Sequence, residues 1–289
     1  ADAWRKALAG GAERRARPAD PAAAGEGGFP LSGLALRAGE LQMLGHRLSD
    51  VNLRAVMEEG GWQARLASRE ASGDIVWRDQ GRGRLQARFR QLALGNGARD
   101  GAADAPRPDE ERLSELPGLD ITADSFTLGS RRFGKLELLA RNEGRVWRLD
   151  KVLLSSPDGS INGKGLWRTD PRGAHRTDVE FKLEAGDAGK YLDRLGFPGT
   201  LKRGSATLAG KLAWNNTPTT LDIPSLSGEV KLTAEKGQFA KIEPGAGKLL
   251  GLLSLQALPR RITLDFRDIF SEGFAFESIS GDVTDRKST

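Results

Sequence analysis

The sequence predicts a mostly β protein: an elongated, curled antiparallel β-sheet in the form of a groove, built of repeated strand units, with two or three short helices. Three observations predict this fold. Apolar residues alternate with polar ones in many short segments, glycine makes up 37 of the 289 residues, and similar blocks recur along the chain. Period-two alternation gives a strand one wet face and one apolar face. Abundant glycine is typical of turns between short strands.

The alternation starts after Phe29, with polar residues such as arginine, asparagine, glutamine or aspartate between the apolar positions. Each alternating group is one predicted strand with a single apolar face. The apolar positions are Leu34 and Leu36; Val51, Leu53, Ala55 and Met57; Trp62, Ala64 and Leu66; Leu85, Ala87 and Phe89; Leu136, Leu138 and Ala140; Val179, Phe181 and Leu183; and Ala206, Leu208, Leu212 and Trp214.

Internal repeats support an extended architecture. The block LGHRLSDVNLRAV, from Leu44, matches LGSRRFGKLELLA, from Leu128, if one residue is inserted. A tryptophan follows each block, and the spacing Gly-x-x-x-Trp then occurs three times, ending at Trp77, Trp167 and Trp214. We interpret these tryptophans as repeated core positions. Repeated strand pairs predict units that each pack on their neighbours.

Composition divides the chain into five segments. Residues 1–28 are an N-terminal segment and flexible linker rich in Gly, Ala and Pro. Residues 29–95 form a first β-repeat unit, 96–112 a loop, 113–186 a second unit, and 187–289 a C-terminal β region. The N-terminus lacks the apolar core and cleavage site of a signal peptide, and both ends lead us to expect a piece of a longer protein.

The C-terminal region contains two predicted short helices, at about residues 187–196 and 245–258. The first has Asp187 as its capping residue and Gly196 as its stop. The second lies in GAGKLLGLLSLQALPRR, which lacks the first glycine and the Ser or Thr of a phosphate-binding loop and is too short to span a membrane. Leucine occupies nearly its whole circumference, so this helix needs covering on most sides.

Charge and residue types exclude several function classes. The net charge of +5 comes from 44 basic and 39 acidic residues mixed along the chain, without the basic, aromatic-rich stripe of a nucleic-acid binder. The absence of cysteine excludes disulfides and thiolate metal sites. We expect His46 and His175 to be surface imidazoles, and the acidic clusters from Asp109 and from Asp265 to be solvated strand ends. The prediction is therefore a protein that is no enzyme, with no catalytic residue, cofactor or metal.

Two or three short helices are too few to cover the apolar faces of so many strands. The sheet must therefore either fold onto itself as a sandwich, or curl around a trough whose apolar lining is covered by something else.

Two segments of the C-terminal region carry a family resemblance. The segment Leu226–Val283, beginning LSGEVKLTAEKGQFAKIEPGAGKLLGLLSL, resembles the C-terminal region of the AsmA-like proteins of Gram-negative bacteria and is most similar to the YhdP type. The segment Asp187–Pro218, DAGKYLDRLGFPGTLKRGSATLAGKLAWNNTP, is similar to the one that precedes it in that family. The family's N-terminal membrane helix and long repeat region have no counterpart in this sequence.

The resemblance implies a large periplasmic protein anchored in the inner membrane, with an apolar β-groove and a role in moving phospholipid between the inner and outer membranes. The implied partners are phospholipids, and bacterial membranes through other parts of the full-length chain. Nucleic acid is not among them, and protein partners stay open. The alternative is a non-enzymatic periplasmic scaffold or docking domain with a closed core and no lipid.

If the groove exists, alternation selects the residues that line it. These are Leu53, Ala55, Leu66, Phe89, Leu136, Leu138, Val179, Phe181, Leu208, Leu212, Leu232, Leu264 and Phe266. The leucine-rich helix is either a plug at one end of the groove, which we favour, or an element that touches a bilayer surface. Its residues are Leu249, Leu250, Leu252, Leu253, Leu255 and Leu258.

Overall fold

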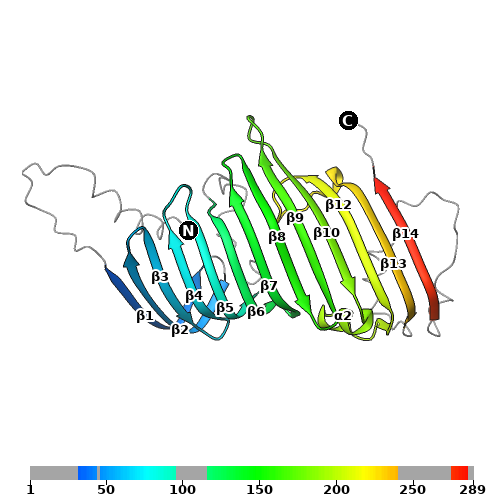
Figure 1. Ribbon diagram of the computed structural model, residues 1–289, viewed down its shortest axis with the longest axis horizontal. Coiled ribbons are helices and arrows are strands. Elements are labelled where there is room, and N and C mark those ends of the chain that lie inside the picture. The colour runs from blue at the N-terminus through cyan, green and yellow to red at the C-terminus, as the bar shows by residue number, and fades with distance from the viewer. Residues whose placement is uncertain (1–31, 44–45, 96–115, 240–274, 286–289) are drawn as a thin grey trace, which may run out of the picture.

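One long, curled and unclosed β-sheet makes up the protein (Figure 1). The computed structural model describes residues 32–43, 46–95, 116–239 and 275–285. Within them the sheet has 14 strands in the order β1-β2-β3-β4-β5-β6-β7-β8-β9-β10-β12-β13-β11, and β14 also pairs with β13. The mostly β, curled sheet predicted from the alternation is therefore confirmed.

The strands follow one another along the sheet nearly in chain order. Their bounds are β1 Gly33–Met43, β2 His46–Glu58, β3 Gly61–Ala67, β4 Ala71–Arg78, β5 Arg84–Leu94, β6 Gly118–Leu128, β7 Arg131–Asn142, β8 Val146–Ser156, β9 Gly159–Thr169, β10 His175–Ala185, β11 Leu201–Lys202, β12 Ser205–Asn215, β13 Ser227–Phe239 and β14 Ala275–Asp285. Two helices lie between them, α2 (Ala188–Arg194) and the short 3₁₀ helix η4 (Ile223–Ser225).

All described strand pairs are antiparallel except β5 and β6, which run parallel. A parallel pair needs a long connection, whereas a tight turn joins antiparallel strands. The connection between β5 and β6 passes through residues 96–115, which lie outside the described part, as does the predicted loop 96–112. The alternation gives no information on strand direction, so this pair was not predicted.

The sheet has two long edges. The upper edge in Figure 1 carries the turns β2–β3, β4–β5, β7–β8 and β9–β10, and the lower edge carries the turns β3–β4, β6–β7 and β8–β9 together with α2. Register shifts interrupt the ladders in β4, β6, β7 and β8, for example between Leu149 and Val152. Because a β-bulge bends its strand and increases the local twist, these irregularities account for part of the curl.

The helix predicted at about residues 187–196 is α2. Asp187 caps it by accepting a hydrogen bond from the backbone N–H of Lys190 at 3.0 Å. Arg194 in its last turn pairs with Asp158 in the β8–β9 turn, which ties the helix to the lower edge. The predicted helix at about 245–258 and the linker 1–28 lie outside the described residues. No helix in the described ranges is long and apolar enough to cross a membrane.

The clusters of buried apolar residues lie along the lower edge, on one face of the sheet. Three clusters are found in the described ranges, and each has members beside a lower-edge turn. The first joins Leu48, Val51, Leu66 and Ala71; the second joins Ala123, Phe126 and Leu136; the third joins Ala185, Ala188, Tyr191, Leu201, Ala234 and Phe276. In the third cluster α2 packs Ala188 and Tyr191 onto the sheet, so the same face receives both the core residues and the helix.

Candidate functional site

Residues on one face of the sheet form two unbroken apolar rows. Pairing places them side by side, strand after strand, across every strand except β11. The first row is Leu36, Leu53, Leu66, Gly73, Phe89, Ala123, Leu136, Leu154, Ile161, Leu183, Leu208, Leu232 and Gly281. The second row is Leu34, Ala55, Ala64, Ile75, Ala87, Ile121, Leu138, Val152, Gly163, Phe181, Gly210, Val230 and Val283. We call this surface the apolar face.

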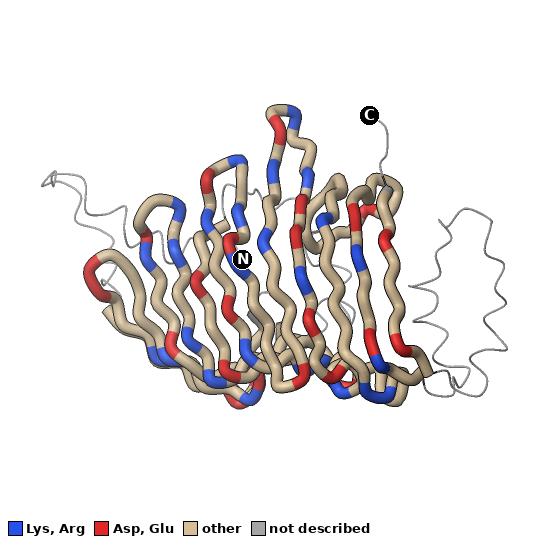
Figure 2. Tube along the Cα trace, turned by 45° about the vertical axis from the view of Figure 1, so that its right-hand side comes forward, with Lys and Arg blue, Asp and Glu red and all other residues tan. Residues whose placement is uncertain are grey.

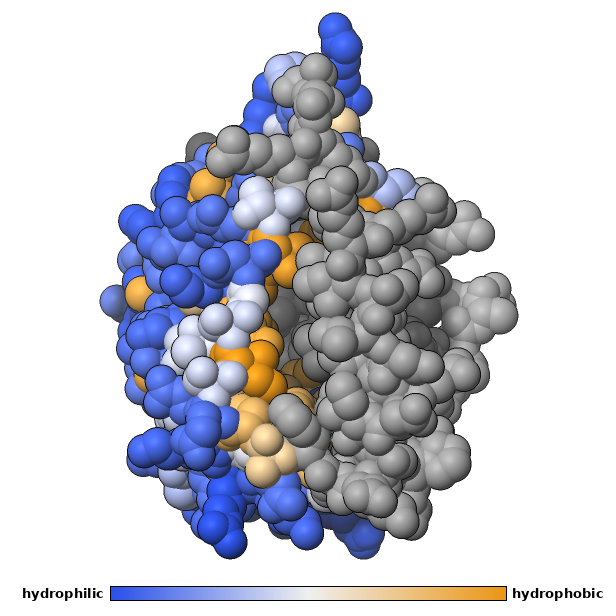
Figure 3. Space-filling model, turned by 90° about the vertical axis from the view of Figure 1, so that its right-hand side faces the viewer, coloured by the Kyte–Doolittle hydropathy of each residue, from blue (hydrophilic) through white to orange (hydrophobic). Residues whose placement is uncertain are grey.

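The opposite face is mostly polar along the same path. The row between the two apolar rows is Ala35, Arg54, Arg65, Asp74, Arg88, Thr122, Glu137, Leu153, Asn162, Lys182, Ala209, Lys231 and Asp282. Opposite charges pair across neighbouring strands, as in Arg65 with Asp74 at 2.8 Å and Lys164 with Glu180 at 3.3 Å. The end-on view in Figure 3 shows hydrophilic atoms on the outer side and hydrophobic atoms facing the interior of the curl.

All the predicted lining residues that the structure describes lie on the apolar face. Six belong to the first row and three to the second; Val179 and Leu212 are paired in the next row toward the upper edge. Leu264, Phe266 and the leucines of the predicted plug helix lie outside the described residues.

The prediction missed the contributions of β6 and β8. Ile121 and Ala123 pair with Leu138 and Leu136 on one side of β7, and Val152 and Leu154 pair with the same two leucines on the other. A register shift after Ala123 breaks the alternation of β6, while β8 reads as the continuous run Val-Leu-Leu. The only sequence signal for these β6 and β8 positions was the similarity between the repeated blocks that start at Leu44 and Leu128.

A cavity of about 510 Å³ lies over β8, β9, β10, β12 and β13, at the row that contains Val179 and Leu212. Its lining includes the paired row Leu149, Gly165, Val179, Leu212 and Gly228. The flanking residues along each strand complete it: Arg148, Asp150, Lys164, Leu166, Asp178, Glu180, Lys211, Ala213 and Ser227. Two positions in the row are glycines, so side chains are missing there and the surface is hollowed.

Five tryptophans lie along the upper edge. Trp62 pairs with Trp77, Trp147 pairs with Trp167, and Thr177 separates Trp167 from Trp214, all on the apolar face. The sequence interpretation of repeated core positions is only partly right, because Trp167 and Trp214 are buried while the other three are half-buried. Each half of the predicted repeat thus places one tryptophan pair at the same edge.

His175 belongs to this edge rather than to the open surface. Its Nδ1 lies 3.2 Å from the indole Nε1 of Trp167 and 3.0 Å from Oγ1 of Thr169, and the ring is half-buried. His46 is also half-buried, and its Nδ1 is buried with no hydrogen-bond partner among the described residues. Neither imidazole is therefore fully exposed, so the expectation of two surface imidazoles was only partly right, and His175 packs against Trp167.

The side chains whose pKa values are shifted lie outside the two apolar rows. A hydrogen bond from Arg141 holds the pKa of Asp150 below its usual value, although burial opposes the shift. Burial between α2 and the sheet raises the pKa of Tyr191. Among the described residues, no group of three or more His, Asp or Glu side chains is placed to hold a metal ion. The apolar face is therefore a long apolar surface whose upper and lower edges carry charged residues (Figure 2).

The family profile described as "YhdP protein" matches residues 1–288. The chain belongs to the YhdP family. A curated YhdP-family relative, the "Intermembrane phospholipid transporter YhdP" of Escherichia coli (strain K12), is 29% identical over 183 residues. The match covers 62% of this chain but only 14% of the relative, so the chain spans a small part of the length of that protein. No solved structure matches the chain.

Proposed function

We propose that the apolar face binds the acyl chains of phospholipids, as one section of a carrier that moves phospholipid between the inner and outer membranes of a Gram-negative envelope. The observation that carries this proposal is the pair of unbroken apolar rows from β1 to β14. Family membership and the phospholipid transport named for the E. coli relative support the choice of phospholipid. On this proposal the chain works in the periplasm, and the full-length protein is anchored in the inner membrane.

The physical properties of the rows suit lipid tails. Neighbouring strands lie about 4.8 Å apart, so a row that crosses every strand but β11 is roughly 58 Å long. One leaflet of hydrocarbon is about 15 Å thick, half of the bilayer core, so the rows can hold more than one tail. Each methylene removed from water contributes about 0.8 kcal/mol. Because apolar contact is non-directional, a tail held in this way can also slide along the face.

The proposed role needs no bond to be made or broken, so we propose that the chain is not an enzyme. Tails lie on the apolar face, and the charged headgroup stays in water at an edge. The alternative, a scaffold with a closed core, needs the apolar face to pack against a second sheet. The described strands instead belong to a single sheet with β1 and β14 at its two ends, and this favours the groove.

The test is to purify the chain without detergent, extract it with organic solvent and search for phospholipid by mass spectrometry. We expect phospholipid to co-purify, and a fluorescent fatty-acid probe to compete with it for the protein. If no lipid is recovered and the probe does not bind, the scaffold alternative replaces this proposal.

A further inference from the structure

The two long edges of the apolar face differ. Every tryptophan in the described ranges lies at the upper edge, within the last three residues of its strand at that end. Toward the lower edge the side chains of the face pack into the buried clusters, and α2 packs on the sheet there. A lipid that occupies the face therefore meets closely packed apolar side chains toward the lower edge and tryptophans along the upper edge.

The indole N–H groups bond to atoms of the upper edge itself. Trp147 donates to the carbonyl of Pro117 at 3.2 Å, Trp214 to the carbonyl of Thr217 at 3.1 Å, and Trp77 to the carboxylate of Asp79. Trp167 donates to His175 at the start of β10. These acceptors lie at or beyond strand ends, so the polar side of each of these indoles faces the edge.

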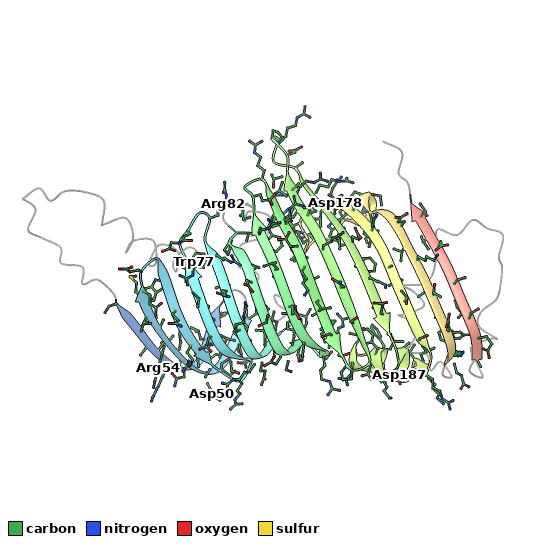
Figure 4. All side chains as sticks on the ribbon, in the orientation of Figure 1. Asp50, Arg54, Trp77, Arg82, Asp178 and Asp187 are labelled. Carbon is green, nitrogen blue, oxygen red and sulfur yellow. The ribbon has the colours of Figure 1, made fainter. Side chains whose placement is uncertain are left out.

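The residues on either side of the tryptophans complete a polarity gradient. Below them, toward the lower edge, come apolar neighbours such as Ile75 and Leu149. Above them, the turns carry arginines, including Arg82 in β4–β5, Arg145 in β7–β8 and Arg172 in β9–β10. Figure 4 shows Trp77 and Arg82 near this upper edge, whereas Asp50 and Asp187 lie at the lower edge. Tryptophan concentrates where an apolar environment meets a wet one, including the headgroup level of bilayers.

We propose that Trp62, Trp77 and Trp147 hold the ester region of a bound phospholipid at the upper edge, with buried Trp167 and Trp214 supporting them. The acyl chains then extend toward the two apolar rows, and the phosphate faces the arginine-bearing turns. This inference rests on the proposed function and adds an orientation to it: headgroups leave by one edge only. The three half-buried tryptophans become positioning residues that set the depth of the lipid.

Tryptophan fluorescence gives a direct test, because bromine quenches an indole only at short range. The full chain with Trp4→Phe, which removes the one tryptophan outside the described ranges, is loaded with phosphatidylcholine brominated at carbons six and seven, or at eleven and twelve, of one tail. Unbrominated lipid is the reference, and mass spectrometry of each sample gives the amount bound. We expect a greater loss of emission with the bromines nearer the ester. Equal or greater loss with the deeper bromines, at equal occupancy, overturns the inference.

A second variant provides the matched control. With Trp62, Trp77 and Trp147 also changed to Phe, the emission comes from Trp167 and Trp214 alone, and we expect the dependence on bromine depth to weaken. The comparison in the Trp4→Phe protein leaves the edge unchanged, so it stays decisive even if the second variant does not fold. If neither brominated lipid binds, the proposed function fails. If both bind with the wrong depth order, only the orientation fails.

Discussion

The indole of Trp167 donates a hydrogen bond to Nδ1 of His175 over 3.2 Å, and the two ring centroids are 5.6 Å apart. Trp167 is 7% exposed, so water has little access to this N–H if the imidazole is removed. Oγ1 of Thr169 lies 3.0 Å from the same nitrogen. A neutral imidazole with Nδ1 as the acceptor satisfies the indole, and the pair lies beside the turn that joins β9 to β10.

Replacement of His175 by Phe should therefore destabilise the protein. The variant keeps a ring against Trp167 but leaves the indole N–H unpaired, which costs about 1–3 kcal/mol for a buried donor. The free energy of unfolding from urea titrations measures the loss. In a Trp167→Phe background there is no N–H to leave unpaired, so the same change at His175 should cost much less. A cost that is the same in both backgrounds contradicts a role for this hydrogen bond.

Acidification should remove the capping of α2 by Asp187. The backbone N–H of Lys190, and next its ammonium group, lower the pKa of Asp187 in the folded protein. The stabilisation is therefore complete above the unfolded pKa, near 4, and is lost as the pH falls through the folded pKa. At neutral pH, Asp187→Ala should cost about 1 kcal/mol of unfolding free energy, as typical for a lost N-cap.

The pH series separates capping from other effects of that substitution. The difference between the wild type and Asp187→Ala should shrink below about pH 4. Asp187→Asn should retain most of the stability at neutral pH, because asparagine caps as well as aspartate and does not titrate. A cost for Asp187→Ala that stays constant with pH shows that the carboxylate charge has no part in it.

The pair Arg194–Asp158 should matter more than the exposed ion pairs of the outer face. The Asp158 side chain is 12% exposed, and its backbone carbonyl also accepts from the N–H of Gly186 at 3.0 Å. Arg194→Ala leaves this carboxylate without its cation, and we expect a loss of about 1–3 kcal/mol in unfolding free energy. Arg65→Ala, which breaks a pair whose side chains are 80% and 56% exposed, is the control and should cost clearly less than Arg194→Ala. Equal losses for the two variants contradict the structural role of the partly buried pair Arg194–Asp158.

Period-two alternation was sufficient to predict the faces of most strands. It placed Leu53, Leu138 and Leu208 on one side of the sheet and Glu137 on the other, because a strand's side chains must alternate. The helix at α2 was also predictable, since its cap and stop are local signals. The tryptophan repeat corresponds in the structure to the pairs Trp62–Trp77 in β3 and β4 and Trp147–Trp167 in β8 and β9.

The remaining features depend on contacts that the local sequence does not encode. The parallel pairing of β5 with β6 arises from the path of the chain between them, which alternation does not record. The bulge of β8 moves the inward positions from Leu149 to Val152, so Val152 was missed, and Ile121 was missed because the alternation of β6 is regular only as far as Ala123. The tryptophan positions at the upper edge follow from register across many strands, and no single strand reveals that they share one edge.

Substitutions on opposite faces of the same strand test the lipid site most directly. Leu138 lies on the apolar face beside Ile121 and Val152, and Glu137 lies on the outer face one residue away. Leu208 and Thr207 are a matched pair in β12, with Leu208 between Leu183 and Leu232. Aspartate at Leu138 or Leu208 puts a charge where the tails would lie, and an unpaired charge in an apolar site is strongly unfavourable.

Lipid bound per protein molecule, from mass spectrometry after detergent-free purification, should therefore fall with Leu138→Asp or Leu208→Asp. It should stay near the wild-type value with Glu137→Asp or Thr207→Asp, because these side chains point away from the tails. Circular dichroism establishes that the strands are retained in each variant. Leu138→Asn, which adds polarity without charge, replaces the aspartate variant if that one unfolds, and should lower occupancy less. Equal occupancy for inward and outward substitutions in folded protein would mean that the lipid does not lie on the apolar face.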